Sequence, residues 1–195
     1  MASLDGQGTR IGEGRGSAAD SEMVILVDRD DRETGVAPKL QAHRDAQLHR
    51  AFSVFVFNRR GEALLQRRAR DKYHSGGLWS NTCCGHPRPG EETGAAARRR
   101  LREEMRVDCE LQHVASIYYR LEVSNGLREH ELDHVFAGQF EGAAQPDPRE
   151  IEDVRWMSVE SLRAALQANP DAYTPWLGVI LPQLEDGRLL PLDVR

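Results

Sequence analysis

CGHPRPGEETGAAARRRLREEMRV, residues 84–107, is the most informative segment of the sequence. From 92 to 106, Ala97, Leu101 and Met105 recur at intervals of four residues. Apolar side chains at this spacing share one face of an α-helix, and the arginine–glutamate pairs beside them, also four residues apart, support the helix. The stretch therefore predicts a loop that leads into an amphipathic helix with charged residues next to its apolar face.

Strand patterns dominate the chain on both sides of this helix. They are runs of β-branched and aromatic residues separated by turn residues. The expected strands are 23–28, 51–57, 62–68, 111–122, 128–140 and 151–158, with 51–57 and 62–68 forming a hairpin, 28–35 a turn-rich connection, and 124–126 the turn of a second strand pair. Further helices are expected at 159–168 and from Pro175 onward. Strands outnumber helices, which predicts an α+β fold.

Composition bounds the domain organisation and the partners. Residues 1–21 are too rich in Gly, Ser, Ala and charge to bury a core, which predicts a disordered tail before a single domain at 22–195. The chain carries 26 Lys+Arg against 31 Asp+Glu, a net charge of −5. This balance argues against a general nucleic-acid or membrane binder. An anionic ligand must therefore meet a local basic cluster.

Apolar runs and cysteines indicate the compartment. The longest apolar runs are far shorter than the ~20 residues that span a bilayer, and the N-terminus has no pattern of a secretory signal. The three cysteines, Cys83, Cys84 and Cys109, form an odd, sparse set that suits a reducing compartment. We expect a cytoplasmic protein, a monomer or weak homodimer, with no nucleic-acid or membrane partner.

The stretch 84–107 resembles the Nudix box. The positions that match are Gly85, Glu91, Arg99, Leu101, Glu103, Glu104 and Val107. Two positions depart from the pattern, because Arg100 stands where Nudix hydrolases usually carry Glu, and Arg106 where they usually carry Gly. The resemblance implies a Nudix-type α/β/α sandwich with a mixed sheet. It also implies a helix whose carboxylates hold Mg²⁺ against a diphosphate through hard oxygen ligands.

A second set of residues has the chemistry of a transition-metal site. Glu129 and Glu131 are two residues apart on an expected strand, so both side chains point from the same face. Imidazole nitrogens together with carboxylate oxygens suit Zn²⁺ or Mn²⁺. The members of the set are His43, His49, His86, Glu129 and Glu131. Because they are dispersed, spacing alone leaves an ordinary hydrogen-bonded imidazole as the alternative for each histidine.

The whole pattern resembles one family, the type 1 isopentenyl-diphosphate isomerases, over about 24–176. The motifs that carry the resemblance, besides the modified Nudix box, are KLQAHRDAQLHRAFS (39–53), LLQRRARDK (64–72), LWSNTCCGHP (78–87), EHELDHVF (129–136) and TPW (174–176). The family converts isopentenyl diphosphate into dimethylallyl diphosphate by protonating one end of an alkene and removing a proton from the other. This activity is the function that the resemblance implies.

The resemblance also implies roles for particular residues. Cys84 would be one acid/base partner, and Glu131, helped by Tyr119, the other. The His/Glu set would bind one Mn²⁺ or Zn²⁺, while Glu104 would bind a Mg²⁺ that bridges to the diphosphate. The residues that would bind the diphosphate itself are Lys39, Arg68 and Lys72, with Arg100 as a fourth. Trp176 is our hypothesis for a ring that stacks on the reacting carbons, because an indole face attracts a cation without offering a bond.

The chemistry itself requires such groups, since an alkene is protonated only by a strong, positioned acid in a site that excludes water. Each residue also has a plainer interpretation. Cys84 could be a structural thiol, Tyr119 a core aromatic and Trp176 the first apolar residue of a helix, while the basic residues could be solvated. Cys83, which would face the other side of an extended segment, is interpreted as packing. Two further functions remain as alternatives: a Nudix hydrolase acting on a nucleoside diphosphate derivative, and a non-catalytic Nudix module that binds a ligand.

Overall fold

A computed structural model of the chain describes residues 22–183, through which a mixed nine-stranded sheet runs. The strands are β1 (Met23–Val27), β2 (Glu33–Pro38), β3 (His49–Phe57), β4 (Glu62–Arg68), β5 (Trp79–Ser80), β6 (Cys83–Gly85), β7 (Leu111–Glu122), β8 (Arg128–Gln139) and β9 (Ile151–Ser158). The helices are α2 (Lys39–Asp45), α3 (Thr93–Met105), α4 (Val159–Ala168) and α5 (Pro175–Gln183). Strands β3 and β8 pair in parallel, and the remaining strand pairs are antiparallel.

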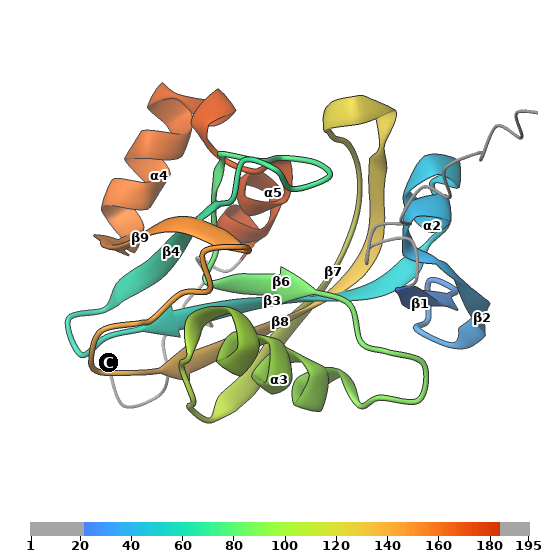
Figure 1. Ribbon diagram of the computed structural model, residues 1–195, viewed down its shortest axis with the longest axis horizontal. Coiled ribbons are helices and arrows are strands. Elements are labelled where there is room, and N and C mark those ends of the chain that lie inside the picture. Colours follow the sequence, from blue (N-terminus) through green and yellow to red (C-terminus); the bar gives the residue numbers. More distant parts are fainter. Residues whose placement is uncertain (1–21, 184–195) are drawn as a thin grey trace, which may run out of the picture.

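Strand β3 lies between the two hydrophobic cores of the fold, and its side chains alternate between them. Phe55 and Phe57 pack in one core with α4 and α5, whereas Val54 and Val56 pack in the other with Leu101 of α3. Helix α3 therefore covers one side of the sheet, and α4 and α5 lie on the other (Figure 1). The expected α+β class, with an α/β/α sandwich and a mixed sheet, is confirmed.

The expected hairpin of 51–57 and 62–68 is correct in its turn and wrong in its pairing. Strands β3 and β4 share one pair, Phe57↔Ala63, and then separate, β3 pairing with β8 and β4 with β9. Residues 79–85 cross this opening, which we call the sheet fork, with β5 on β4 and β6 on β3. The glycine-containing turn at 58–61 sets where the chain reverses, but buried side chains decide which strand each arm pairs with.

The ends of the expected elements agree with local chemistry. Helix α3 begins after Glu92, whose carboxylate accepts hydrogen bonds from the backbone N–H groups of the first turn, and it ends at Arg106, which has φ +54°. The turn between β7 and β8 contains Asn125 and Gly126, both with positive φ, as expected from the sequence.

Two elements near the N-terminus were not predicted. Strand β2 begins inside 28–35, which was expected to be a connection, and five of its six residues are exposed, so no apolar alternation marks it. Helix α2 has seven residues and no capping side chain. The expected tail at 1–21 lies outside the described residues, as do residues 184–195 of the expected domain. Among residues 22–183, no helix has the length and apolar character that crossing a membrane requires.

Candidate active site and metal centre

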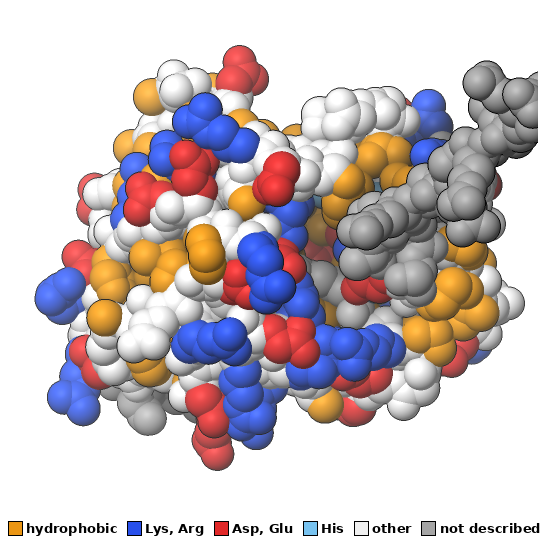
Figure 2. Space-filling view, in the orientation of Figure 1, with side chains coloured by type: hydrophobic (Ala, Val, Ile, Leu, Met, Phe, Trp, Pro, Cys, Tyr) orange, Lys and Arg blue, Asp and Glu red, His pale blue; other side chains and the backbone are white. Residues whose placement is uncertain are grey.

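A cavity of about 600 Å³ lies beside β3 and β6, and its walls include parts of α3, β7, β8 and α5. Figure 2 shows the hollowed face, with Lys and Arg side chains gathered beside the hollow. The expected site residues that line the cavity are Lys39, Arg68, Lys72, Cys84, His86, Arg100, Glu104, Tyr119, Glu129, Glu131 and Trp176. The remaining two, His43 and His49, are fully buried and join the same site through their contacts with Glu129 and Glu131. The structure thus brings together every residue that the sequence singled out.

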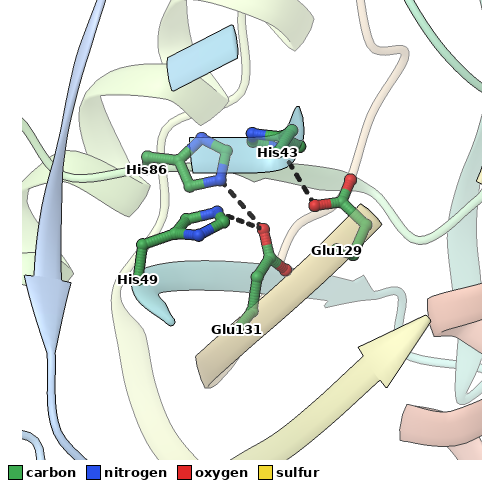
Figure 3. Close-up of side chains that lie close together, drawn as sticks. All are labelled: His43, His49, His86, Glu129 and Glu131. Atoms are coloured by element: carbon green, nitrogen blue, oxygen red, sulfur yellow. Dashed lines mark hydrogen bonds and ion pairs between the residues drawn. The ribbon is translucent and has the colours of Figure 1, made fainter. Parts of the chain in front are cut away.

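The His/Glu set forms one cluster (Figure 3). One ligand atom from each of its five members lies within 4.8 Å of every other, and all five residues are buried. The parallel pairing of β3 with β8 causes this, because it sets His49 directly opposite Glu131. Helix α2 adds His43, and the residue after β6 adds His86.

The donor atoms of this cluster fit a divalent metal ion. Nδ1 of His43 lies 2.7 Å from the carbonyl oxygen of Lys39, and Nδ1 of His49 lies 2.8 Å from that of Gln47. Each ring therefore donates outward from Nδ1 and turns the lone pair of Nε2 toward the cluster, as metal-binding histidines do. Among the described residues neither Nε2 has a hydrogen-bond partner, although His43 Nε2 is 3.0 Å from Oε2 of Glu129.

Protonation states in the cluster also suit a metal. Burial lowers the pKa of His86 to about 4, so its imidazole is neutral at pH 7, as a metal ligand must be. Burial alone would raise the pKa of Glu129, but its close contacts with His43 and His74 hold this pKa well below its usual range. The contact with Glu129 in turn raises the pKa of His43 against the effect of burial. The cluster thus combines the neutral imidazole of His86 with an ionised carboxylate, and both are donors that suit a transition-metal site.

Two groups with dissociable protons line the cavity next to the cluster. Burial raises the pKa of the Cys84 thiol to about 12, and its Sγ is 3.8 Å from Nη1 of Arg68. The hydroxyl of Tyr119 donates to Oε2 of Glu131 at 2.5 Å and to Oδ2 of Asp133 at 3.1 Å. Cys83 is fully buried in the core with α3, so the expected alternation of the two cysteines between opposite faces is confirmed.

Three of the cationic side chains that line the cavity are held in ion pairs. Lys39 lies 2.8 Å from Glu22, and Lys72 pairs with Glu150. Arg100 pairs with Glu104 on the next turn of α3 and lies 3.4 Å from Glu150. These contacts keep positive and negative groups interleaved around one cavity. A bound anion would therefore exchange with carboxylates that are already in place.

Arg68 and Trp176 both line the cavity, and Arg68 lies next to the thiol of Cys84. The guanidinium carbon of Arg68 is 5.3 Å from the ring centre of Trp176, and Nη2 donates to the carbonyl oxygen of His74 at 3.3 Å. The indole N–H of Trp176 donates to Oδ1 of Asn81 at 3.2 Å, which fixes the plane of the ring. Trp176 thus serves both the core and the cavity, since it belongs to the core of α4 and α5 and also lines the site.

Sequence reasoning missed several acidic or basic residues of this region, among them Asp133, Glu22, His74 and Glu150. Asp133 continues the two-residue spacing of Glu129 and Glu131, so that alternation was a signal for it. Glu22, His74 and Glu150 lie in irregular segments, where no periodicity marks a buried residue. His74 is 2% exposed and its Nε2 is 2.9 Å from Oε1 of Glu129.

Comparisons with known proteins agree with this geometry. The NUDIX domain model matches residues 47–177. The chain is 50% identical over 169 residues to isopentenyl-diphosphate Delta-isomerase 2 of Aromatoleum aromaticum, a match that covers 87% of this chain and 89% of that protein. It is 52% identical over 155 residues to the isopentenyl-diphosphate Delta-isomerase of Burkholderia multivorans, covering 80% and 88% of the two chains.

Solved structures with the same fold are more distant in sequence. The crystal structure of DR0079 from Deinococcus radiodurans superposes with a TM-score of 0.73 at 21% identity, covering 84% of this chain and 99% of that one. This likeness shows the fold alone. The domain match and the half-identical relatives show that the chain belongs to the NUDIX family and, within it, to the isopentenyl-diphosphate Delta-isomerases.

Proposed function

We propose that the protein converts isopentenyl diphosphate into dimethylallyl diphosphate. One observation carries the proposal: a half-buried thiol, Cys84, and a buried carboxylate–phenol pair, Glu131 with Tyr119, line the same cavity. Moving a double bond by one carbon requires one proton to be added and another to be removed, with no other change in atoms. Two acid/base groups in a site that excludes bulk water meet that requirement.

Cys84 and Glu131 are the proposed acid/base pair. The raised pKa of Cys84 keeps a proton on sulfur at pH 7, so the thiol is the protonated member of the pair. Glu131 is fixed by the hydroxyl of Tyr119 on one oxygen and by His86, 2.9 Å away, on the other. A carboxylate with both oxygens held has a defined direction toward the cavity. One of the pair protonates the alkene, and the other removes the second proton from the resulting tertiary carbocation.

Binding of the diphosphate is assigned to Lys39, Arg68, Lys72 and Arg100. The diphosphate displaces Glu22 and Glu150 from their ion pairs with Lys39 and Lys72. Each lysine therefore exchanges one anionic partner for another, and no further desolvation of its ammonium group is needed. Glu104, buried beside Arg100, is the proposed protein ligand of a Mg²⁺ that bridges to the diphosphate. The His/Glu cluster holds one Mn²⁺ or Zn²⁺, and when bound these ions supply positive charge beside Glu131 and neutralise the diphosphate.

Trp176 is the proposed wall behind the reacting carbons. The guanidinium of Arg68 already lies over its ring, and Trp176 lines the cavity. In a dry site this attraction reaches ~2 kcal/mol. A carboxylate in the same place would capture the carbocation, whereas the ring offers no bond.

We also infer a cytoplasmic protein that acts on a small diphosphate as a monomer or weak homodimer, without a nucleic-acid or membrane partner. The net charge of −5 supports this inference. So does the surface, where Val36 and Tyr118 are the exposed large hydrophobic residues of the described chain. Light scattering after gel filtration should give the mass of one chain at micromolar concentration. A stable tetramer would contradict it.

The decisive test is proton NMR of isopentenyl diphosphate with the protein and Mg²⁺ in deuterated water. We expect dimethylallyl diphosphate with deuterium incorporated. Release of phosphate without the isomer would identify a hydrolase, and binding without either product would identify a non-catalytic module.

The neighbouring cysteines provide a matched pair of variants for this test. Cys84→Ala should lower kcat by about 10²- to 10⁴-fold, the usual contribution of a positioned acid or base. Cys83→Ala should keep kcat, because Cys83 faces the core with α3. An inactive Cys83 variant beside an active Cys84 variant would reverse the assignment.

A further inference from the structure

His74 lies in the loop between β4 and β5, in a stretch of sequence without periodicity. Its backbone is nevertheless held firmly, because Nη2 of Arg68 donates to its carbonyl oxygen at 3.3 Å. Its two neighbours are tied to the turn between β7 and β8. Asn125 Nδ2 donates to the carbonyl oxygen of Tyr73 at 2.8 Å, and the backbone N–H of Ser75 donates to Oγ of Ser124 at 2.9 Å. The position of the imidazole is thus fixed from two sides.

The ring of His74 faces the metal cluster without belonging to it. Its Nε2 lies 2.9 Å from Oε1 of Glu129, at ion-pair distance, and makes no hydrogen bond among the described residues. Its Nδ1 is 3.3 Å from Oγ of Ser75. The ring and Oε1 of Glu129 are therefore in direct polar contact. His74 is not among the five residues whose ligand atoms converge.

The two oxygens of Glu129 therefore have different neighbours. Oε1 faces His74, and Oε2 is 3.0 Å from Nε2 of His43, inside the cluster. A carboxylate held through one oxygen offers the other in a fixed direction. Outer partners of this kind orient metal ligands, and their loss typically costs 10- to 100-fold in metal affinity.

We propose that His74 is a positioning residue of the metal centre, which holds Oε1 of Glu129 so that Oε2 is presented to the ion. The proposal rests on the metal site of the proposed function and adds a residue to it. The edge of the same ring also packs against Trp176, with ring centres 5.9 Å apart at 90°. One loop residue thus contacts both the metal cluster and the proposed carbocation wall.

The test measures Mn²⁺ affinity in the absence of substrate, by competition with a chelator and by the EPR signal of the ion. His74→Ala should weaken Mn²⁺ binding about 10- to 100-fold. His74→Gln keeps an N–H donor on a side chain of similar reach and should restore most of the affinity. His134→Ala is the matched control, because His134 also lies 3.0 Å from a carboxylate, that of Asp31, but outside the cluster. Its Mn²⁺ affinity should equal that of the unmodified chain.

Melting of the metal-free variants separates positioning from folding. The proposal requires that metal-free His74→Gln has the same melting temperature as the unmodified chain, and that His74→Ala binds Mn²⁺ weakly. Affinity of His74→Ala within twofold of the unmodified chain would overturn the proposal. Equal loss in the Ala and Gln variants would also overturn it, since the imidazole itself would then be a ligand. If the unmodified chain and Glu129→Gln bind Mn²⁺ equally poorly, the metal site of the proposed function fails, and this inference fails with it.

Discussion

The reactivity of the Cys84 thiol can be measured in metal-free protein that carries Cys83→Ala and Cys109→Ala, so that Cys84 is the one cysteine left. We expect its alkylation by iodoacetamide to be slow and steeply dependent on pH. Burial raises the pKa of the Cys84 thiol from 9.0 to about 12. The thiolate is the form that reacts. A rise of three units lowers the thiolate fraction at neutral pH about a thousandfold, which corresponds to ~4 kcal/mol.

The assay follows the mass of the alkylated chain between pH 7 and pH 10, for the folded protein and for the same chain in urea. In the folded protein the logarithm of the rate should rise by about one per pH unit over the whole interval. In urea the rise should end near the ordinary pKa of a thiol. Limited access of the reagent lowers the folded rate at every pH but leaves this slope unchanged, so the slope reports the pKa.

A folded rate that stops rising near pH 9 would refute the reasoning. The thiol of Cys84 would then ionise as easily as one in water, and the cavity would not be dry enough to keep it protonated. Cys84 would in that case be a stronger acid than the buried thiol described above. The outcome thus bears directly on how readily Cys84 gives up its proton.

Three further predictions concern other parts of the chain. Arg106→Gly should raise the free energy of unfolding by about 1 kcal/mol, measured by urea denaturation, because Arg106 ends α3 with φ +54°, where glycine has no steric cost; a lower stability would contradict the backbone argument. Trp176→Phe should lower kcat moderately and Trp176→Leu by up to about thirtyfold, the equivalent of ~2 kcal/mol; equal kcat in both, or loss in step with melting temperature, would make the residue packing alone. Glu104→Gln should raise the Mg²⁺ concentration needed for activity, yet elemental analysis should still find the metal of the His/Glu cluster; loss of that metal would merge the two proposed metal sites.

The sequence predicted the elements whose residues repeat regularly. Helix α3 was visible in Ala97, Leu101 and Met105, and these three residues are fully buried under the sheet. The opposite faces of Cys83 and Cys84 followed from strand alternation alone. The common face of Glu129 and Glu131 followed in the same way.

The remaining features depend on contacts between distant segments. The parallel pairing of β3 with β8 joins His49 to Glu131, which are 82 residues apart, and no local pattern encodes it. Strand β2 escaped detection because its residues are largely exposed on both faces. His74 and Glu22 lie in irregular segments and become recognisable when the chain folds and places them next to Glu129 and Lys39. Sequence motifs thus identified the members of the site, and tertiary packing supplies their partners.

The sheet fork has a mechanical consequence for the thiol. Across the fork, the hydroxyl of Thr82 donates to the carbonyl oxygen of Leu64 on β4 at 2.6 Å and accepts from the N–H of Val56 on β3 at 2.8 Å. One buried side chain thus takes the place of a missing rung between the two arms. Cys84, two residues later, is carried by a segment fastened to both arms at once, so bending of the sheet moves the thiol together with Arg68 at the end of β4. When the arms flex thermally, Cys84 and Arg68 therefore keep their separation, although they lie on strands that have few contacts with each other.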